Sequence, residues 1–151
     1  MKAKTGMTTE SPDQLITRSL DQYFVGNIKA AEAIDIHYAA MWRELDRLVR
    51  SGGKRMRPKI TLMCYQAFGG KDIKAILPIA TAQELLHQFL LIHDDIIDRD
   101  HIRYGVENIT GRYKVLYKPY VKNASDLEHY SNSAALLAGD LLHSGAHQLI
   151  A

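Results

Sequence analysis

Apolar residues recur at three- and four-residue spacing along most of the chain, which is the pattern of amphipathic helices. Ser11-Pro12 is a typical helix start, with serine as the capping residue and proline at the first helical position. The apolar stripe that follows is predicted to end, or to be interrupted, at Gly26-Asn27. A second, longer helix is predicted from about residue 28 to residue 50.

Glycine and proline divide the rest of the chain. A third helix is predicted to begin at Pro58 and to end before Gly69. The next helical stretch leads into an acidic segment and contains Pro78, which predicts a kink or a new start. Residues 99–130 are the least regular part, and a final helix is predicted from about Ser131 onward.

The sequence predicts an all-α protein, because no segment shows sustained two-residue alternation. Its 151 residues are one domain's length, which we divide into a flexible tail at 1–10 and a helical domain at 11–151. The last helix is still apolar at Ala151. We therefore expect the sequence to be the N-terminal part of something longer, or to need a partner that covers this surface.

The amino-acid composition is that of a soluble globular protein and indicates little else about function. Hydrophobic residues make up 46% and charged residues 24%, with a net charge of +2, which indicates neither disorder nor a nucleic-acid partner. The first ten residues lack the apolar core of a secretory signal, and no apolar run approaches the roughly 20 residues of a membrane span. The single cysteine, Cys64, is predicted to be a buried small hydrophobic residue. We expect a cytoplasmic protein.

Chemistry is concentrated at residues 84–98, ELLHQFLLIHDDIID, where an apolar helix ends in three carboxylates. Asp94 and Asp98 are one turn apart and share a face, with Asp95 to one side. The C-terminus of a helix carries about half a negative charge, so carboxylates there favour a cation. Oxygen ligands at this spacing suit Mg²⁺, which completes its shell with water and phosphate. The alternative is a solvated helix end that binds no metal.

A second charged segment, SGGKRMRP at residues 51–58, precedes the predicted third helix. Lys54, Arg55 and Arg57 would surround a helix N-terminus, whose free N–H groups and positive dipole end favour anions. Arginine binds phosphate oxygens in pairs, and lysine adds a mobile point charge. The alternative is a charged turn between two helices.

Two further residues link the segments. His87 precedes Asp94 by two helical turns and lies on nearly the same face, although a lone histidine on an apolar helix is more often a core residue. Arg103, five residues beyond Asp98, is either a salt-bridge partner or a second contact to a metal-bound phosphate. A basic and an acidic cluster on adjoining elements suit two anionic groups, for which diphosphates are the natural candidates.

The order and spacing of four motifs resemble the trans-isoprenyl diphosphate synthases, the polyprenyl synthetase family, and look most like a geranylgeranyl diphosphate synthase. The motifs are GGKRMRP at 52–58, ELLHQFLLIHDDIID at 84–98, Arg103 with Gly105, and LLAGDLL at 136–142. The resemblance covers roughly residues 45–150. It implies the N-terminal part of the isoprenoid synthase helical bundle, without its C-terminal helices, in a homodimer or heteromer.

The resemblance also implies two binding sites for substrate. By position, Lys54, Arg57 and His87 would bind the diphosphate of isopentenyl diphosphate, and Arg103 would contact the allylic diphosphate and take part in catalysis. In the implied reaction the allylic carbon–oxygen bond ionises, the isopentenyl double bond attacks the carbocation, and a proton is lost.

The same resemblance implies a cofactor and a limit on product length. Asp94 and Asp98, with Asp95 beside them, would bind the Mg²⁺ ions that bridge the allylic diphosphate. Phe89 and Leu90, five and four residues before Asp94, would floor the cavity and restrict the product to short or medium chains. We expect a product of twenty carbons, with a product of fifteen carbons as the next candidate. Plain core packing is the alternative for Phe89.

The chain departs from the family at three places. Tyr104 stands where a second arginine is usual, so one ligand for isopentenyl diphosphate is missing or supplied differently. Residues 115–130, VLYKPYVKNASDLEHY, look like an insertion, which is either a lid, an interface or a solvated surface. The family's second aspartate-rich motif does not occur in the chain, so we expect little or no prenyl transfer by these 151 residues alone.

Two other functions stay open. A noncatalytic regulatory or scaffold subunit of a heteromeric synthase is opposed by the retained carboxylates of Asp94, Asp95 and Asp98. A relative of the terpene cyclases is opposed by the GGKRMRP segment, because a cyclase has no second diphosphate to bind.

Overall fold

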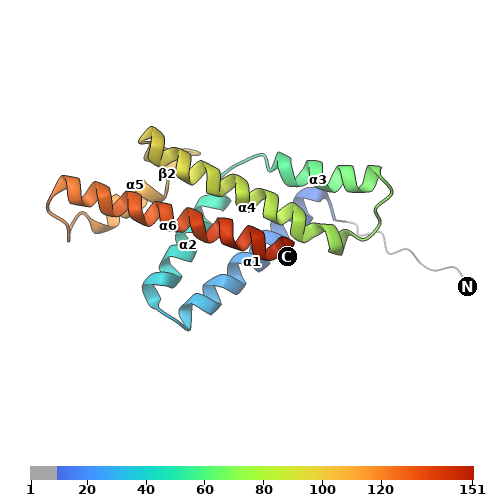
Figure 1. Ribbon diagram of the computed structural model, residues 1–151, viewed down its shortest axis with the longest axis horizontal. Helices are drawn as coiled ribbons and strands as arrows, with labels where there is room; N and C mark the ends of the chain where they lie inside the picture. The colour runs from blue at the N-terminus through green and yellow to red at the C-terminus, as the bar shows by residue number, and fades with distance from the viewer. Residues whose placement is uncertain (1–9) are drawn as a thin grey trace, which may run out of the picture.

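The computed structural model describes residues 10–151, and within this range the fold consists of six α-helices and one two-stranded hairpin (Figure 1). The predicted tail at 1–10 lies outside the described residues except for Glu10. In chain order the elements are α1 (Pro12–Glu32), α2 (Ile36–Ser51), α3 (Met56–Ala67), α4 (Ile73–Asp98), β1 (Ile102–Arg103), β2 (Val106–Glu107), α5 (Ile109–Tyr117) and α6 (Ala124–Ile150). The prediction of an all-α protein is confirmed.

The first helix starts where the sequence predicts. The Ser11 side chain accepts a hydrogen bond from the Gln14 N–H, and the Gln14 side chain accepts one from the Ser11 N–H, which makes a capping box. The predicted end at Gly26-Asn27 is wrong, because α1 continues to Glu32. Phe24 is buried before this pair. Packing of the helix therefore outweighs the roughly 1 kcal/mol that a glycine costs inside a helix.

The turn at residues 33–35 folds α2 back along α1, and its tip projects away from the other helices (Figure 1). Asp35 caps α2 by accepting hydrogen bonds from the N–H groups of His37 and Tyr38. Phe24 and Trp42 meet edge to face with ring centroids 6.3 Å apart, so the hairpin has its own aromatic core.

α4 and α6 are the longest helices, with 26 and 27 residues, and they lie side by side in the most extensive contact of the fold (Figure 1). They run antiparallel, because Phe89 contacts His143 whereas His93 contacts Leu136. Small residues on α6, including Ala138 and Gly139, are buried against α4. This close packing of the two helices fixes the position of the acidic C-terminal end of α4.

α4 continues through Pro78 as one helix instead of starting anew there. Pro78 is the sixth residue of α4, so the missing N–H removes a single hydrogen bond near the helix start. Asp72 replaces part of that loss by capping the N–H groups of Lys74 and Ala75.

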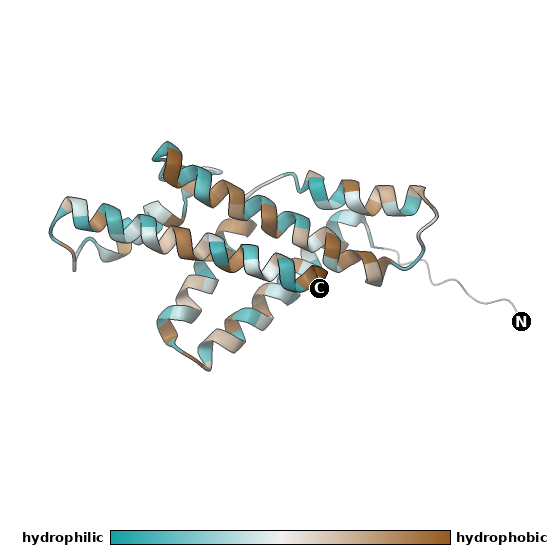
Figure 2. Cartoon of the chain, in the orientation of Figure 1, coloured by the Kyte–Doolittle hydropathy of each residue, from teal (hydrophilic) through white to brown (hydrophobic). Residues whose placement is uncertain are grey.

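By length and composition alone, α4 is long and apolar enough to cross a membrane. The prediction that no apolar run approaches this length is therefore wrong. Figure 2 shows apolar and polar stretches alternating along the helix. Thr81, Glu84 and Gln88 are buried on it among the other helices, as expected of a core helix that packs against protein.

The segment that looked least regular is mostly ordered. β1 and β2 pair antiparallel around Tyr104-Gly105, whose φ angles of 54° and 79° match a tight type I′ turn. α6 begins at Ala124, earlier than predicted, and takes up part of the supposed insertion at 115–130. Within that segment, Leu127 is buried and Tyr117 packs on Tyr130 with ring centroids 4.6 Å apart. The segment is thus largely helical, but most of its residues are exposed, so it lies at the surface of the fold.

Cys64 is exposed, so its predicted burial is wrong. The buried residues of α3 are Pro58 and Leu62, which form a narrow strip facing α4. A helix that lies on the outside of the bundle needs only such a strip, and Cys64 falls on its outer side.

Candidate functional site

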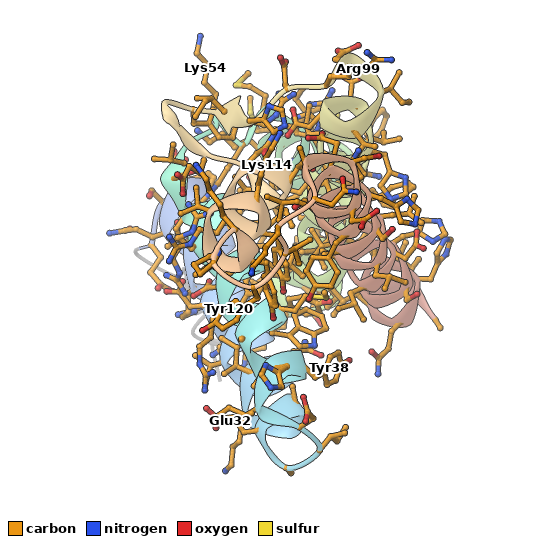
Figure 3. The ribbon with its side chains drawn as sticks, turned by 90° about the vertical axis from the view of Figure 1, so that its left-hand side faces the viewer. Glu32, Tyr38, Lys54, Arg99, Lys114 and Tyr120 are labelled. Carbon is orange, nitrogen blue, oxygen red and sulfur yellow. The ribbon has the colours of Figure 1, made fainter. Side chains whose placement is uncertain are left out.

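The predicted basic segment forms one wall of a pocket at the start of α3. This pocket has a volume of about 510 Å³ and combines the turn after α2 with α4 and the hairpin, through Gly53, Lys54, Arg55, Met56, Arg57, Glu84, His87 and Tyr104. The structure therefore brings the three residues predicted to bind one diphosphate, Lys54, Arg57 and His87, into one cavity. Lys54 projects into solvent at the same edge of the molecule as Arg99, which follows α4 (Figure 3).

Arg55 differs from its two cationic neighbours. It precedes α3 in the left-handed conformation, with a φ of 47°, and its Nη1 donates to Thr17 Oγ1 on α1 over 2.6 Å. Lys54 and Arg57 form no ion pair within residues 10–151. Arg55 thus anchors the turn, whereas Lys54 and Arg57 line the pocket without an ion-pair partner in this range.

The pocket changes the protonation of His87. Burial lowers the pKa of His87 below its ordinary value of 6.5, and the positive charge of Arg57 lowers it further. Glu84 acts in the opposite direction, and Arg103 adds a smaller lowering effect. At neutral pH the imidazole is uncharged, and an anion in the pocket would favour its protonation.

This lowered pKa predicts a pH-dependent loss of stability. As the pH falls below about 6.5, the unfolded chain binds a proton at His87 before the folded chain does, so the free energy of unfolding decreases. The loss is complete once the pH is below the lowered pKa of the folded state. We expect His87→Gln to remove this part of the decrease between pH 7.5 and 5, measured by urea denaturation.

His129, an exposed histidine of α6, supplies the control for that measurement as His129→Gln. It should leave the pH dependence as it is in the unmodified chain. Equal pH dependence in His87→Gln and the unmodified chain would contradict the shift.

Tyr104, which takes the place of the usual second arginine, packs against the glycine turn. A Cβ atom added at Gly52 would lie 2.6 to 2.9 Å from the Cγ, Cβ and Cδ1 atoms of the Tyr104 side chain. Gly52 has an extended backbone with a φ of 178°, so the glycine is needed here for space rather than for backbone freedom. The tyrosine ring therefore holds the turn that presents Lys54.

Gly52→Ala should destabilise the chain by about 1–3 kcal/mol, because the added methyl group pushes into the Tyr104 ring. The same substitution should cost much less in a Tyr104→Ala background, where the clash is gone. Urea denaturation of the two single variants and the double variant measures this difference. An equal cost in both backgrounds would show that the ring does not hold the turn.

The three aspartates at the end of α4 separate into two environments. Asp94 and Asp98 are exposed, whereas Asp95 is only 2% exposed. The helix ends at Asp98, and Arg99 follows in the left-handed conformation with a φ of 60°. The sequence grouped all three as metal ligands, but only Asp94 and Asp98 are exposed to solvent, where a metal could reach them.

Asp95 instead holds the hairpin. Its Oδ1 accepts a hydrogen bond from Arg103 Nε over 2.9 Å and a second one from Nη2. This carboxylate raises the pKa of Arg103 further above its ordinary range, mainly through the hydrogen bonds, and Asp94 contributes by its charge. Asp95 is therefore placed to position Arg103.

Sequence reasoning missed Glu84 and Gln88. Both are fully buried on α4, and Gln88 Nε2 donates to Glu84 Oε1 over 3.0 Å. Within the described part of the chain, Glu84 Oε2 and Gln88 Oε1 find no hydrogen-bond partner. Glu84 also lines the basic pocket, so it places a negative charge behind the cations. A glutamate and a glutamine one turn apart on an apolar helix were the signal that could have revealed them.

The exposed pair of carboxylates fits Mg²⁺. Neither Asp94 nor Asp98 forms an ion pair within residues 10–151, and both lie at the helix end where negative charge is least stable. No group of three or more His, Cys, Asp or Glu side chains in this range is arranged to hold a metal ion. Magnesium suits such a site, because it needs one or two carboxylates and takes its remaining ligands from water and phosphate.

A sequence profile of the polyprenyl synthetase family matches residues 39–151, which is most of the chain. The chain belongs to the polyprenyl synthetase family. The match begins within α2 and includes both charged clusters, so the family's sequence pattern covers the whole candidate site.

Curated family members resemble the chain over about two thirds of its length. It is 39% identical over 103 residues to the geranylgeranyl diphosphate synthase of Methanosarcina mazei, covering 68% of the chain and 26% of that protein. It is 40% identical over 105 residues to the geranylfarnesyl diphosphate synthase of Aeropyrum pernix, covering 69% of the chain and 28% of that protein. The chain thus spans about a quarter of the length of these relatives.

A solved family structure confirms the fold. The geranylgeranyl pyrophosphate synthase of Corynebacterium glutamicum, complexed with isoprenyl diphosphate and magnesium, superposes with a TM-score of 0.80 at 23% identity. The alignment covers 95% of the chain and 42% of that protein. The helices of this family member therefore have the arrangement of the isoprenoid synthase fold.

The two residues predicted to limit product length have different surroundings in this family member. Phe89 is half-buried between α4 and α6, with its ring centroid 4.6 Å from that of His93 and 4.8 Å from that of His143. Leu90 is 60% exposed. The role of either residue in product length stays a prediction.

Proposed function

We propose that the chain binds isopentenyl diphosphate and an allylic diphosphate as part of a trans-prenyltransferase. One observation carries this proposal: a single guanidinium, Arg103, is close to both charged clusters. Arg103 is bonded to Asp95, the residue next to Asp94, and it precedes Tyr104, which lines the basic pocket with His87. Two anion sites that share one arginine suit a reaction between two diphosphates.

In this proposal each cluster has its own substrate. Lys54 and Arg57 bind the diphosphate of isopentenyl diphosphate, and His87 donates a hydrogen bond to it. Asp94 and Asp98 would hold Mg²⁺, which would supply positive charge to neutralise the allylic diphosphate as it leaves. Arg103, fixed by Asp95, adds a contact to the same diphosphate. Oriented this way, the chain brings the two reacting groups together and stabilises charge on the one that leaves.

The proposed product has twenty carbons, with fifteen as the next candidate. The relative from Methanosarcina mazei is named a geranylgeranyl diphosphate synthase, and the pattern before Asp94 resembles that of short- to medium-chain enzymes. Phe89 supports a short product, because its half-buried ring fills space between α4 and α6. We place the activity in the cytoplasm, in a homodimer or heteromer.

We further propose that these 151 residues bind diphosphates but transfer prenyl groups poorly on their own. The chain contains one aspartate-rich motif, and Asp94 and Asp98 are its two exposed carboxylates. The test incubates the purified chain with Mg²⁺, isopentenyl diphosphate and farnesyl diphosphate, and follows both binding and elongation. We expect Mg²⁺-dependent binding with little product. Robust elongation would refute the inactivity, and absence of any Mg²⁺-dependent binding would refute the site.

A second candidate function is a subunit of a two-component synthase. A relative from Geobacillus stearothermophilus, 29% identical over 79% of the chain, is named heptaprenyl diphosphate synthase component 2. Exposed apolar residues on α4 and α6, such as Ile97 at 77% and Leu137 at 57%, offer a surface for another subunit. Elongation only after a second chain is added would favour this function, whereas the exposed Asp94 and Asp98 argue against a purely structural role.

A further inference from the structure

Two histidines on α6 lie together outside the diphosphate site. His143 and His147 are four residues apart and therefore on one face of the helix, and their Nε2 atoms are 3.1 Å apart. Their rings meet edge to face, with centroids 4.5 Å apart. In the absence of a ligand the two Nε2 atoms share a hydrogen bond, so they are close enough to contact the same ion.

This separation matches a shared metal ion. Zinc–imidazole bonds of about 2.0–2.1 Å place the two nitrogens about 2.9 Å apart at a right angle and about 3.4 Å apart at a tetrahedral angle. The observed 3.1 Å lies between these values. Two histidines at positions i and i+4 of a helix are a common arrangement for binding zinc.

The surroundings orient the pair and favour a cation. The Phe89 ring packs on His143 from α4, with centroids 4.8 Å apart, which restricts the imidazole. Asp140 precedes His143 by one turn of α6 and lies 3.6 Å from His93 Nε2, so it adds negative charge beside the pair. His147 and Asp140 are exposed, so an ion can reach the site from solvent.

We propose that His143 and His147 form a two-histidine site for a divalent transition-metal ion, with zinc as the first candidate. Water completes the coordination shell, since no third side chain among residues 10–151 is arranged to join the pair. Imidazole selects zinc, copper or nickel, whereas carboxylates and water suit magnesium. The site is therefore chemically distinct from Asp94 and Asp98.

The site is also separate in space. α6 runs antiparallel to α4, so the helix passes His93 and then Phe89 before it reaches His147. Each step along α6 in this direction leads away from the acidic end of α4. Because His143 also contacts Phe89, an ion bound to the pair would fix one wall of the space that Phe89 fills.

The test titrates ZnCl₂ into the full chain, purified without a histidine tag and stripped of metal with a chelator. Isothermal titration calorimetry is performed in an Asp94→Asn/Asp98→Asn background, so that zinc bound at the acidic end does not contribute. We expect one zinc ion per chain. His147→Gln should weaken binding by at least about tenfold, since even loss of a partner outside the coordination shell costs 10–100-fold.

His129→Gln is the matched control, because His129 is an exposed histidine of α6 with serine at both positions four residues away. It should leave the affinity unchanged. Imidazole ¹⁵N NMR gives an independent readout, since zinc should shift the Nε2 signals of His143 and His147 together. Absence of zinc binding, or equal affinity in His147→Gln and the parent, would overturn the proposal and leave only a hydrogen bond between the rings.

Discussion

Replacing Asp94 and Asp98 together with asparagine should abolish Mg²⁺-dependent binding of diphosphate while the fold stays intact. Two unit charges 4 Å apart in water interact by about 1 kcal/mol, so each exposed carboxylate contributes about 2 kcal/mol toward a divalent ion. Loss of both corresponds to roughly 100- to 1,000-fold in affinity. Calorimetric titration with inorganic diphosphate, with and without Mg²⁺, measures the effect, and removal of Mg²⁺ with EDTA should reproduce it in the unmodified chain.

The same double variant should be slightly more stable than the unmodified chain. Both carboxylates lie within the last five residues of α4, where the helix dipole disfavours each by about 0.3–1 kcal/mol. Asp100→Asn is the matched control, because Asp100 is an exposed acid just beyond the helix. It should change Mg²⁺-dependent binding by less than threefold or so, as expected for a surface charge outside the shell. Equal losses in the control and the double variant would indicate general electrostatics instead of a metal site.

Asp95→Asn should have the opposite effect on stability. Asp95 is 2% exposed and accepts two hydrogen bonds from a charged donor, Arg103, each of a kind worth about 1.5–3 kcal/mol. The asparagine also leaves an N–H₂ group where Asp95 Oδ2 finds no partner within the described chain. Since Arg103 keeps 21% of its side chain exposed, we expect a loss of about 2 kcal/mol, or roughly 4–8 °C in Tm.

A double-mutant cycle separates this pair from its surroundings. Arg103→Gln alone should also destabilise the chain, because it leaves Asp95 buried without its cation. The double variant Asp95→Asn/Arg103→Gln should lose much less than the sum of the two single losses. Strictly additive losses would refute the pairing. In binding experiments Asp95→Asn should lower the affinity for the allylic diphosphate, because Arg103 is no longer held in place. The binding should still depend on Mg²⁺.

The charged clusters could be predicted from the sequence because each is local. Asp94 and Asp98 share a helix face by spacing alone, and Lys54 and Arg57 lie within one turn of the helix start that Pro58 predicts. His87 joined them by the same helical periodicity, and the structure brings it into one pocket with the two cations. Short-range geometry was sufficient for these residues.

The role of Asp95 could not be predicted in the same way. Its partner comes from a hairpin whose turn is Tyr104-Gly105, and tyrosine at a positive φ is not a residue that predicts a type I′ turn. Without the hairpin, Arg103 has no defined direction, and Asp95 looks like a third metal ligand. A contact between residues eight positions apart through a turn of this kind depends on tertiary structure.

The errors in helix boundaries have a related cause. Gly26 signals a break by propensity, yet burial of Phe24 and Ala31 on either side keeps α1 intact. Cys64 lies in an apolar run, but the outer helix α3 buries a strip too narrow to include it. In α1, packing outweighs the tendency of Gly26 to break the helix. In α3, the apolar run around Cys64 does not lead to its burial, because the neighbouring helices determine which face is covered.

Among residues 10–151, three non-glycine residues have a positive φ angle, Arg55, Arg99 and Tyr104, and all of them lie beside the charged clusters. A left-handed conformation costs an ordinary residue about 1 kcal/mol, so the chain gives up roughly 3 kcal/mol of a typical stability of 5–15 kcal/mol at these positions. Directed evolution for heat resistance should therefore find glycine or asparagine at position 99 first, since the exposed Arg99 lines no part of the basic pocket. Glycine or asparagine at position 55 or 104 would also raise heat resistance, but it would weaken ligand binding in the basic pocket.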